Sequence, residues 1–172
     1  GGYGYMREYP VERYFRDGAK YIYLYRDGRD VAVSFRKAVV GEKHFYHIAK
    51  EWGASQRIAL GMRERAGPKR FISVRYEDIT AQPESTMQRV CKFLGYRYTP
   101  SMLDFHETDE AKKAAKSSDL WGNVANPVMA DNTRKFLREA GEADIRVFEL
   151  VAGDALDALG YERVATRKGE KG

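Results

Sequence analysis

The chain has 172 residues, of which 43% are hydrophobic and 32% are charged, and its formal net charge is +5. A chain of this length and composition can bury a substantial core, so we expect a single domain over residues 1–172 rather than a disordered tail. One cysteine and three histidines exclude an internal disulfide and give no zinc-binding spacing, so we expect no metal. The sequence has no apolar run of about 18 residues, which argues against stable membrane insertion.

The positive charge is concentrated in one part of the chain. Residues 57–75 contain six basic residues and one acidic residue, whereas residues 131–162 contain eight acidic and four basic residues. A basic face can attract a nucleic acid, an anionic membrane or a small polyanion. Because acids are interleaved with the bases and no nucleic-acid-binding signature appears, we expect no nucleic-acid partner.

The first predicted elements are a short helical turn and a strand. Residues 1–19 form an irregular lead-in, within which residues 12–16 could make one helical turn. Residues 21–25 are all aromatic or aliphatic, a pattern typical of a strand that is covered on both faces. Asp27 and Gly28 then form a strong turn signal that ends this strand.

Helical spacing returns after the turn. A helix is expected from about Asp30, with Asp27 or Asp30 as its N-terminal cap and Gly41 at its end. A longer helix is predicted over residues 43–65 and a second strand over residues 71–76. The remaining predicted elements are a helix over residues 83–94 ended by Gly95, a helix over 101–115, an irregular stretch over 117–132, a helix over 142–159 ended by Gly160, and a frayed tail over 163–172.

This order of elements predicts the fold class. Strands that alternate with helices indicate a parallel sheet with helices packed against it, which is an α/β fold. Two strands are too few for a complete sheet of this kind, in which about five are usual. We therefore expect the sheet to be incomplete.

The end of the first strand is the best candidate for a binding site. Arg26 follows that strand directly, and α/β sheets bind ligands at the carboxyl ends of their strands. The next helix offers unpaired N–H groups at its start and a hydroxyl, Ser34, about one turn inside, so a phosphate would fit here. In the alternative interpretation, Arg26 pairs with Asp30 and Ser34 bonds to its own helix, and the residues alone leave both open.

The segment YRDGRDVAVSF resembles the 3′-phosphate-binding segment of sulfotransferases that use 3′-phosphoadenosine 5′-phosphosulfate as their donor. The resemblance implies that Arg26 and Ser34 bind the 3′-phosphate of the donor. The later segments VRYED and FLG are similar to a second region of the same family. This similarity implies that Tyr76 lies against the adenine.

A third segment, from Asn126 to Glu162, resembles the C-terminal part of the family. There a Lys or Arg before an aromatic residue reaches the nucleotide, which implies this role for Lys135, with Arg134 as the second candidate. Phe136 departs from the family pattern, because the family usually has Trp at that position.

Together the three matches span about residues 20–162 and imply a P-loop-like sulfotransferase architecture. They also imply transfer of a sulfuryl group from 3′-phosphoadenosine 5′-phosphosulfate to a hydroxyl or amine of a small-molecule, carbohydrate or peptide acceptor. The Gly-, Ser- and Thr-rich loop that holds the 5′-phosphosulfate in the family has no counterpart before Tyr21, and neither has the catalytic base. The resemblance therefore implies an architecture that is incomplete at the N-terminus. We therefore expect this chain to supply the 3′-phosphate and adenine anchor and to need upstream residues for turnover.

The rival function is a non-catalytic module that binds a nucleotide or another polyanion. The missing signal segment and the single cysteine favour a cytoplasmic location. Among other reactive or aromatic side chains, His44 and His47 are expected at the surface, Trp52 in the core, and Cys91 buried and inert on an apolar helix stripe.

Overall fold

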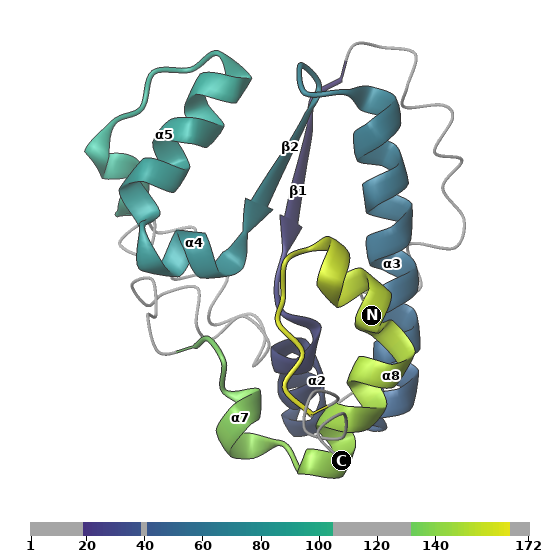
Figure 1. Ribbon diagram of the computed structural model, residues 1–172. Coiled ribbons are helices and arrows are strands. Elements are labelled where there is room, and N and C mark those ends of the chain that lie inside the picture. Colours follow the sequence, from purple (N-terminus) through teal and green to yellow (C-terminus); the bar gives the residue numbers. More distant parts are fainter. Residues whose placement is uncertain (1–18, 39–40, 105–131, 166–172) are drawn as a thin grey trace.

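The structure is a computed structural model that describes residues 19–38, 41–104 and 132–165 (Figure 1). The described residues alternate between strands and helices, as the sequence predicts. In chain order the elements are β1 (Tyr21–Tyr25), α2 (Gly28–Lys37), α3 (Phe45–Ala66), β2 (Phe71–Arg75), α4 (Tyr76–Ala81), α5 (Pro83–Leu94), the 3-10 helix η2 (Pro100–Leu103), α7 (Phe136–Glu139) and α8 (Glu142–Ala158).

The two strands pair in parallel, with Tyr21 opposite Phe71 and Tyr25 opposite Arg75. A parallel pair needs a crossover connection, and α2 and α3 provide it. Figure 1 shows α3 and α8 on one side of the strand pair and α4 and α5 on the other. The predicted α/β class, with a parallel sheet flanked by helices, is therefore confirmed.

The covering of β1 differs from the prediction. Its tyrosines at positions 23 and 25 pack against the core, whereas Ile22 and Leu24 on the opposite face are 47% and 58% exposed. The expectation that this strand is covered on both faces is thus wrong for the described structure. The reason is that α4 and α5 follow β2 and pack against β2, where Val74 is buried.

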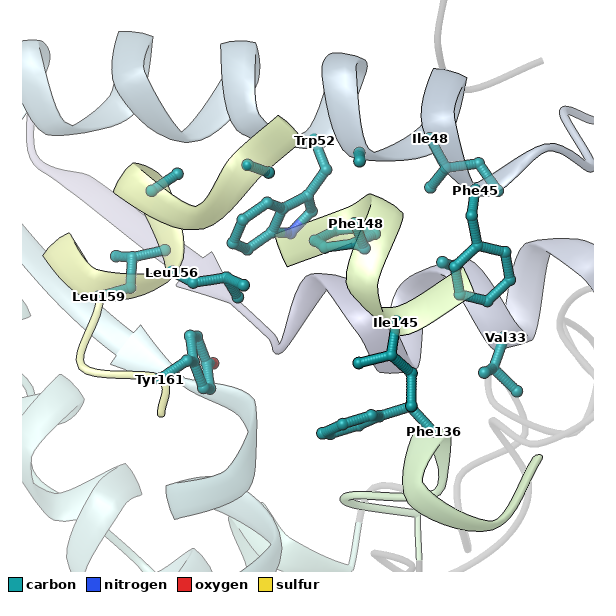
Figure 2. Close-up of a cluster of buried hydrophobic side chains, with 14 residues drawn as sticks. Val33, Phe45, Ile48, Trp52, Phe136, Ile145, Phe148, Leu156, Leu159 and Tyr161 are labelled. Carbon is teal, nitrogen blue, oxygen red and sulfur yellow. The ribbon is translucent and has the colours of Figure 1, made fainter. Parts of the chain in front are cut away.

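The core lies between α3 and α8, and Figure 2 shows its larger side chains. Trp52 of α3 meets Phe148 of α8 with ring centroids 5.6 Å apart, so the predicted core position of Trp52 is confirmed. Gly28, the first residue of α2, lies against both rings. A Cβ atom there would come within 2.5 Å of each ring, so only glycine fits without displacement.

Most predicted helix boundaries agree with the structure within two residues. Asp27 caps α2 as expected, because its side chain accepts the Arg29 backbone N–H at 2.9 Å. Gly95 ends α5 in the left-handed conformation that favours glycine. However, α2 ends at Lys37 rather than at Gly41, because Ala38 is extended and its N–H already closes the last turn.

Two further predictions fall partly outside the described residues. Of the helix expected over 101–115, the structure describes only η2, which ends before Asp104, and the rest lies outside the described ranges. The helical turn over 12–16 and the stretch over 117–131 lie outside them as well. In the C-terminal tail, Val164 and Ala165 donate backbone hydrogen bonds to Glu149, so this part of the tail is held in place.

The single-residue expectations can also be compared with the structure. His44 and His47 are exposed, and Cys91 is a free, buried cysteine, as predicted. Within the described residues, no three His, Cys, Asp or Glu side chains lie close enough to hold a metal ion. None of the helices in this part of the chain is long and apolar enough to cross a membrane.

Candidate functional site

The candidate site lies where the carboxyl ends of the two strands meet. Arg26 follows β1 directly, and Tyr76 follows β2 as the first residue of α4. Because the strands are parallel and in register, these two residues emerge at the same edge of the sheet. The guanidinium of Arg26 lies over the Tyr76 ring, 4.5 Å from its centroid.

The Arg26 guanidinium is only partly satisfied by its neighbours. Its Nη2 atom donates to the backbone oxygen of Asn132 and lies 3.9 Å from the Asp30 carboxylate. Its Nε atom is buried and has no hydrogen-bond partner among the described residues. A buried N–H group without an acceptor is costly, so this atom fits a site whose ligand supplies one.

Lys135 brings a second cation to the same place. Its ammonium donates to Asn132 Oδ1 at 3.2 Å, and Asn132 Nδ2 donates to the Tyr76 hydroxyl at 3.1 Å. Burial lowers the pKa of Lys135, and the positive charge of Arg26 lowers it further. Two cations held this close favour an anion between or beside them.

Asp30 fixes the segment that carries Lys135. Its carboxylate is fully buried and accepts the backbone N–H groups of Arg134 at 2.7 Å and Phe136 at 3.0 Å. Burial raises the pKa of Asp30, while these hydrogen bonds and the nearby Arg26 oppose the rise. The carboxylate therefore fastens a distant segment to the start of α2.

Arg134 and Lys135 differ in their exposure to solvent. Arg134 is exposed, and its φ angle of +54° places it in the left-handed region. Lys135, which is partly buried and bonded to Asn132, is the member of this pair that the structure brings to Arg26 and Tyr76.

Ser34 lies farther along α2. Its hydroxyl donates to the backbone oxygen of Asp30 at 3.0 Å and, within the described part of the chain, makes no hydrogen bond to Arg26. Both contacts of the alternative interpretation are thus present: the loose Arg26–Asp30 pair and the bond from Ser34 to its own helix. Both groups are hydrogen-bond donors, which is what a phosphate oxygen requires of its partners.

A buried ion network lies behind the site. Arg29 is 2% exposed; it donates two bonds to Asp27 and one to Glu149 at 2.6 Å, and it also bonds the backbone oxygen of Glu162. Its guanidinium stacks on Phe136, 4.1 Å from the ring centroid. The network joins the start of α2 to α8 and to the C-terminal segment.

Glu77 makes a further link between the two strand ends. One carboxylate oxygen accepts the Asp27 backbone N–H at 3.0 Å, and the other accepts the Tyr161 hydroxyl at 3.0 Å. Burial and this carboxylate raise the pKa of Tyr161. The segments that carry Arg26 and Tyr76 are therefore held together by a side chain next to Tyr76.

Of the five site residues expected from the sequence, the structure brings three together, namely Arg26, Tyr76 and Lys135. Sequence reasoning missed Asn132, which contacts all three. The only signal for Asn132 was its place three residues before Lys135 in the third matching segment.

The sequence of this chain is similar to those of known proteins. The family described as "Sulfotransferase family" matches residues 12–100. The chain is 29% identical over 154 residues to protein-tyrosine sulfotransferase A of Caenorhabditis elegans, a match that covers 84% of this chain and 39% of the relative. It is 26% identical over 171 residues to 3-beta-hydroxysteroid sulfotransferase of Cavia porcellus, covering 88% and 58%.

A solved structure has the same fold. The sulfotransferase domain from the curacin biosynthetic pathway superposes with a TM-score of 0.57 and 22% sequence identity, over 86% of this chain and 56% of that domain. The chain thus spans between about two fifths and three fifths of the lengths of these proteins.

Proposed function

The chain belongs to the sulfotransferase family, and from this premise we propose that it forms the donor-nucleotide anchor of an enzyme that transfers a sulfuryl group from 3′-phosphoadenosine 5′-phosphosulfate. The observation that carries the proposal is the convergence of two cations near Tyr76: Arg26 lies over its ring, and Lys135 is joined to its hydroxyl through Asn132. The buried Nε atom of Arg26, which lacks an acceptor within the described residues, supports a phosphate ligand there.

Each residue has a distinct role in this proposal. Arg26 and Lys135 bind the 3′-phosphate dianion, with the Ser34 hydroxyl as an additional donor once it turns from the Asp30 carbonyl. The Tyr76 ring offers a flat apolar surface to the adenine. Arg134, which is exposed, is a second candidate cation at the rim of the site.

The bound donor supplies a sulfuryl group on a good leaving group. In the transfer, the bond from sulfur to the phosphate oxygen breaks, a bond from sulfur to the acceptor oxygen forms, and the acceptor proton goes to a base. Such a step needs mainly positioning and charge stabilisation from the protein. The described residues provide the positioning, and we assign the base to none of them.

We propose a hydroxyl group as the acceptor. The relatives are named for tyrosine and for a 3-beta-hydroxysteroid, and both compounds present a hydroxyl to the transferred group. An amine acceptor is the second possibility. The acceptor's carrier, whether a small molecule, a carbohydrate or a peptide, is open in this proposal.

Calorimetric titration tests the anchor. Wild type should bind adenosine 3′,5′-bisphosphate more tightly than adenosine 5′-monophosphate, because only the former carries the 3′-phosphate. Arg26→Ala removes a charge-assisted hydrogen bond of roughly 1.5–3 kcal/mol, so it should weaken bisphosphate binding by about 10- to 100-fold. Arg57→Ala, which removes an exposed arginine paired with Asp154, is the control and should change neither affinity.

The rival, a non-catalytic polyanion-binding module, predicts a different pattern. It should bind inorganic tripolyphosphate as well as the bisphosphate nucleotide, and Arg26→Ala should weaken both equally. Equal affinity of wild type for the two adenosine nucleotides would contradict the anchor proposal. A transfer assay with labelled donor and a panel of hydroxyl acceptors then tests the catalytic part separately.

A further inference from the structure

We propose that Asn132 is a positioning residue of the nucleotide anchor, which holds the two cations and the Tyr76 ring in one arrangement before the nucleotide binds. This inference rests on the proposed function, because it names the residue that organises that same site. Asn132 lies within the third matching segment, and the resemblance implies no role for it.

The geometry of Asn132 is the first argument. Its side-chain Nδ2 donates to the Tyr76 hydroxyl at 3.1 Å, its Oδ1 accepts from the Lys135 ammonium at 3.2 Å, and its backbone oxygen accepts from Arg26. These three partners come from three different parts of the chain: the end of β1, the start of α4 and the segment before α7. No other described residue is hydrogen-bonded to all three.

The chemistry of the amide is the second argument. An ammonium group only donates, so the amide oxygen must face Lys135, and the NH2 group must then face Tyr76. A carboxylate at this position would keep the acceptor and lose the donor, and an alanine would lose both. Asparagine is therefore matched to its two partners at the same time.

The charges give the third argument. Arg26 and Lys135 repel each other, and this repulsion contributes to the lowered pKa of Lys135. Asn132 places one carbonyl oxygen against each cation, the backbone oxygen against Arg26 and Oδ1 against Lys135. It thereby offsets part of the repulsion and keeps both cations in place for a dianion, which reduces the cost of ordering them on binding.

The titration of the Lys135 ammonium tests this role without any nucleotide. The charged groups that act on it are Arg26 and Lys37, which lower its pKa, and Asp30 and Glu139, which raise it. All four are unchanged in variants of Asn132. Asn132→Ala removes an acceptor from the charged form and should lower the pKa of Lys135, whereas Asn132→Asp adds a negative charge and should raise it.

The two variants separate positioning from structural support. If Asn132 merely supported the fold, both variants would loosen the site, expose Lys135 and move its pKa in the same upward direction. Side-chain NMR of selectively labelled lysine in the full chain measures these shifts, with Lys135→Arg to assign the signal. Opposite shifts in the two variants support the proposal, and shifts in one common direction overturn it.

Nucleotide binding is the second measurement. Asn132→Ala should weaken adenosine 3′,5′-bisphosphate binding by about tenfold, the effect of losing roughly one hydrogen bond to a charged group. It should weaken adenosine 5′-monophosphate binding less, because in this proposal the monophosphate meets the Tyr76 ring but presents no 3′-phosphate to the two cations. Gln88→Ala is a control, because Gln88 is exposed on α5 and bonds only Glu84 in the described structure. Equal weakening of both nucleotides, or no weakening of the bisphosphate, contradicts the inference.

The proposed function and this inference fail in different ways. If wild type shows no preference for the bisphosphate over the monophosphate, the anchor proposal fails, and the Lys135 titration still decides whether Asn132 positions the cation. If wild type prefers the bisphosphate and Asn132→Ala binds it equally well, only the inference about Asn132 fails.

Discussion

Asp30 accepts a hydrogen bond from the backbone N–H of Phe136, a residue 106 positions later in the chain. The second carboxylate oxygen accepts the N–H of Arg134 in the same way. One buried side chain thus decides where the segment with Lys135 lies relative to Arg26. This link makes the site sensitive to a residue that need not touch the nucleotide.

Asp30→Asn should therefore destabilise the protein and weaken the nucleotide site together. An asparagine has one acceptor oxygen, so one of the two N–H groups would face an NH2 group, at a cost of about 1–3 kcal/mol. Urea denaturation measures the loss. Asp144→Asn is the control, because the Asp144 side chain is 40% exposed and its pair with Arg36 should contribute little. Equal stability of the two variants would show that Asp30 does not hold the segment from Arg134 to Phe136 in place.

A larger residue in place of Gly28, the first residue of α2, should clash with its neighbours. In Gly28→Ala the new Cβ would lie 2.5 Å from atoms of Trp52 and Phe148, and the rings or α2 must move. We expect a loss of about 1–3 kcal/mol in the free energy of unfolding.

Gly61 provides a matched control for this substitution. It lies within α3, and a Cβ there would meet no atom within 4 Å. Gly61→Ala should raise the free energy of unfolding by about 0.5–1 kcal/mol, because alanine favours the helix. Thermal denaturation of both variants checks the opposite signs, and a common sign would show that packing around Gly28 is loose.

Much of the fold could be predicted from the sequence because its signals are local. The strand over residues 21–25 and the helix around Trp52 follow from hydrophobic patterns within a few residues. The exposure of Ile22 and Leu24 could not be predicted, because an apolar run does not say which face a distant helix covers. Tertiary packing decides that question.

The candidate site was predictable to a similar extent. Arg26 follows from the rule that α/β sheets bind ligands at the carboxyl ends of their strands. Tyr76 and Lys135 came only from the family resemblance. Asn132 and Glu77 could not be assigned, because their contacts with Tyr76 and Asp27 cross 56 and 50 positions and leave no periodic pattern.

Loss of the buried ion pairs of Arg29 should lower the free energy of unfolding strongly. Arg29→Met would leave the carboxylates of Asp27 and Glu149 without their cation in a buried setting. Breaking such a network typically costs about 3–5 kcal/mol. Arg57→Met removes a comparable but exposed pair with Asp154 and should cost less than about 1 kcal/mol. Chemical denaturation that found similar losses for both would refute the buried network.

Replacing Arg134 by glycine should stabilise the protein through the backbone. Its φ angle of +54° is unfavourable for a residue with a Cβ atom, by roughly 1–2 kcal/mol, and glycine avoids this strain. After the entropy cost of glycine, Arg134→Gly should be stabilising by up to about 1 kcal/mol. Arg138→Gly, within α7, should instead be destabilising. Thermal denaturation compares them, and a loss in both would place the strain elsewhere.

The titration of Lys135 should determine how the affinity for adenosine 3′,5′-bisphosphate depends on pH. The pKa of Lys135 lies below its ordinary value of 10.5, so its charge is lost at a lower pH than in other lysines. Above that pKa the neutral amine no longer attracts the phosphate, and the affinity should fall as the pH rises. Lys135→Arg keeps its charge at every accessible pH, so its affinity should stay constant over the same range. Lys37→Arg, an exposed control paired with Glu139, should follow wild type, whereas parallel curves for wild type and Lys135→Arg would exclude Lys135 as the titrating group.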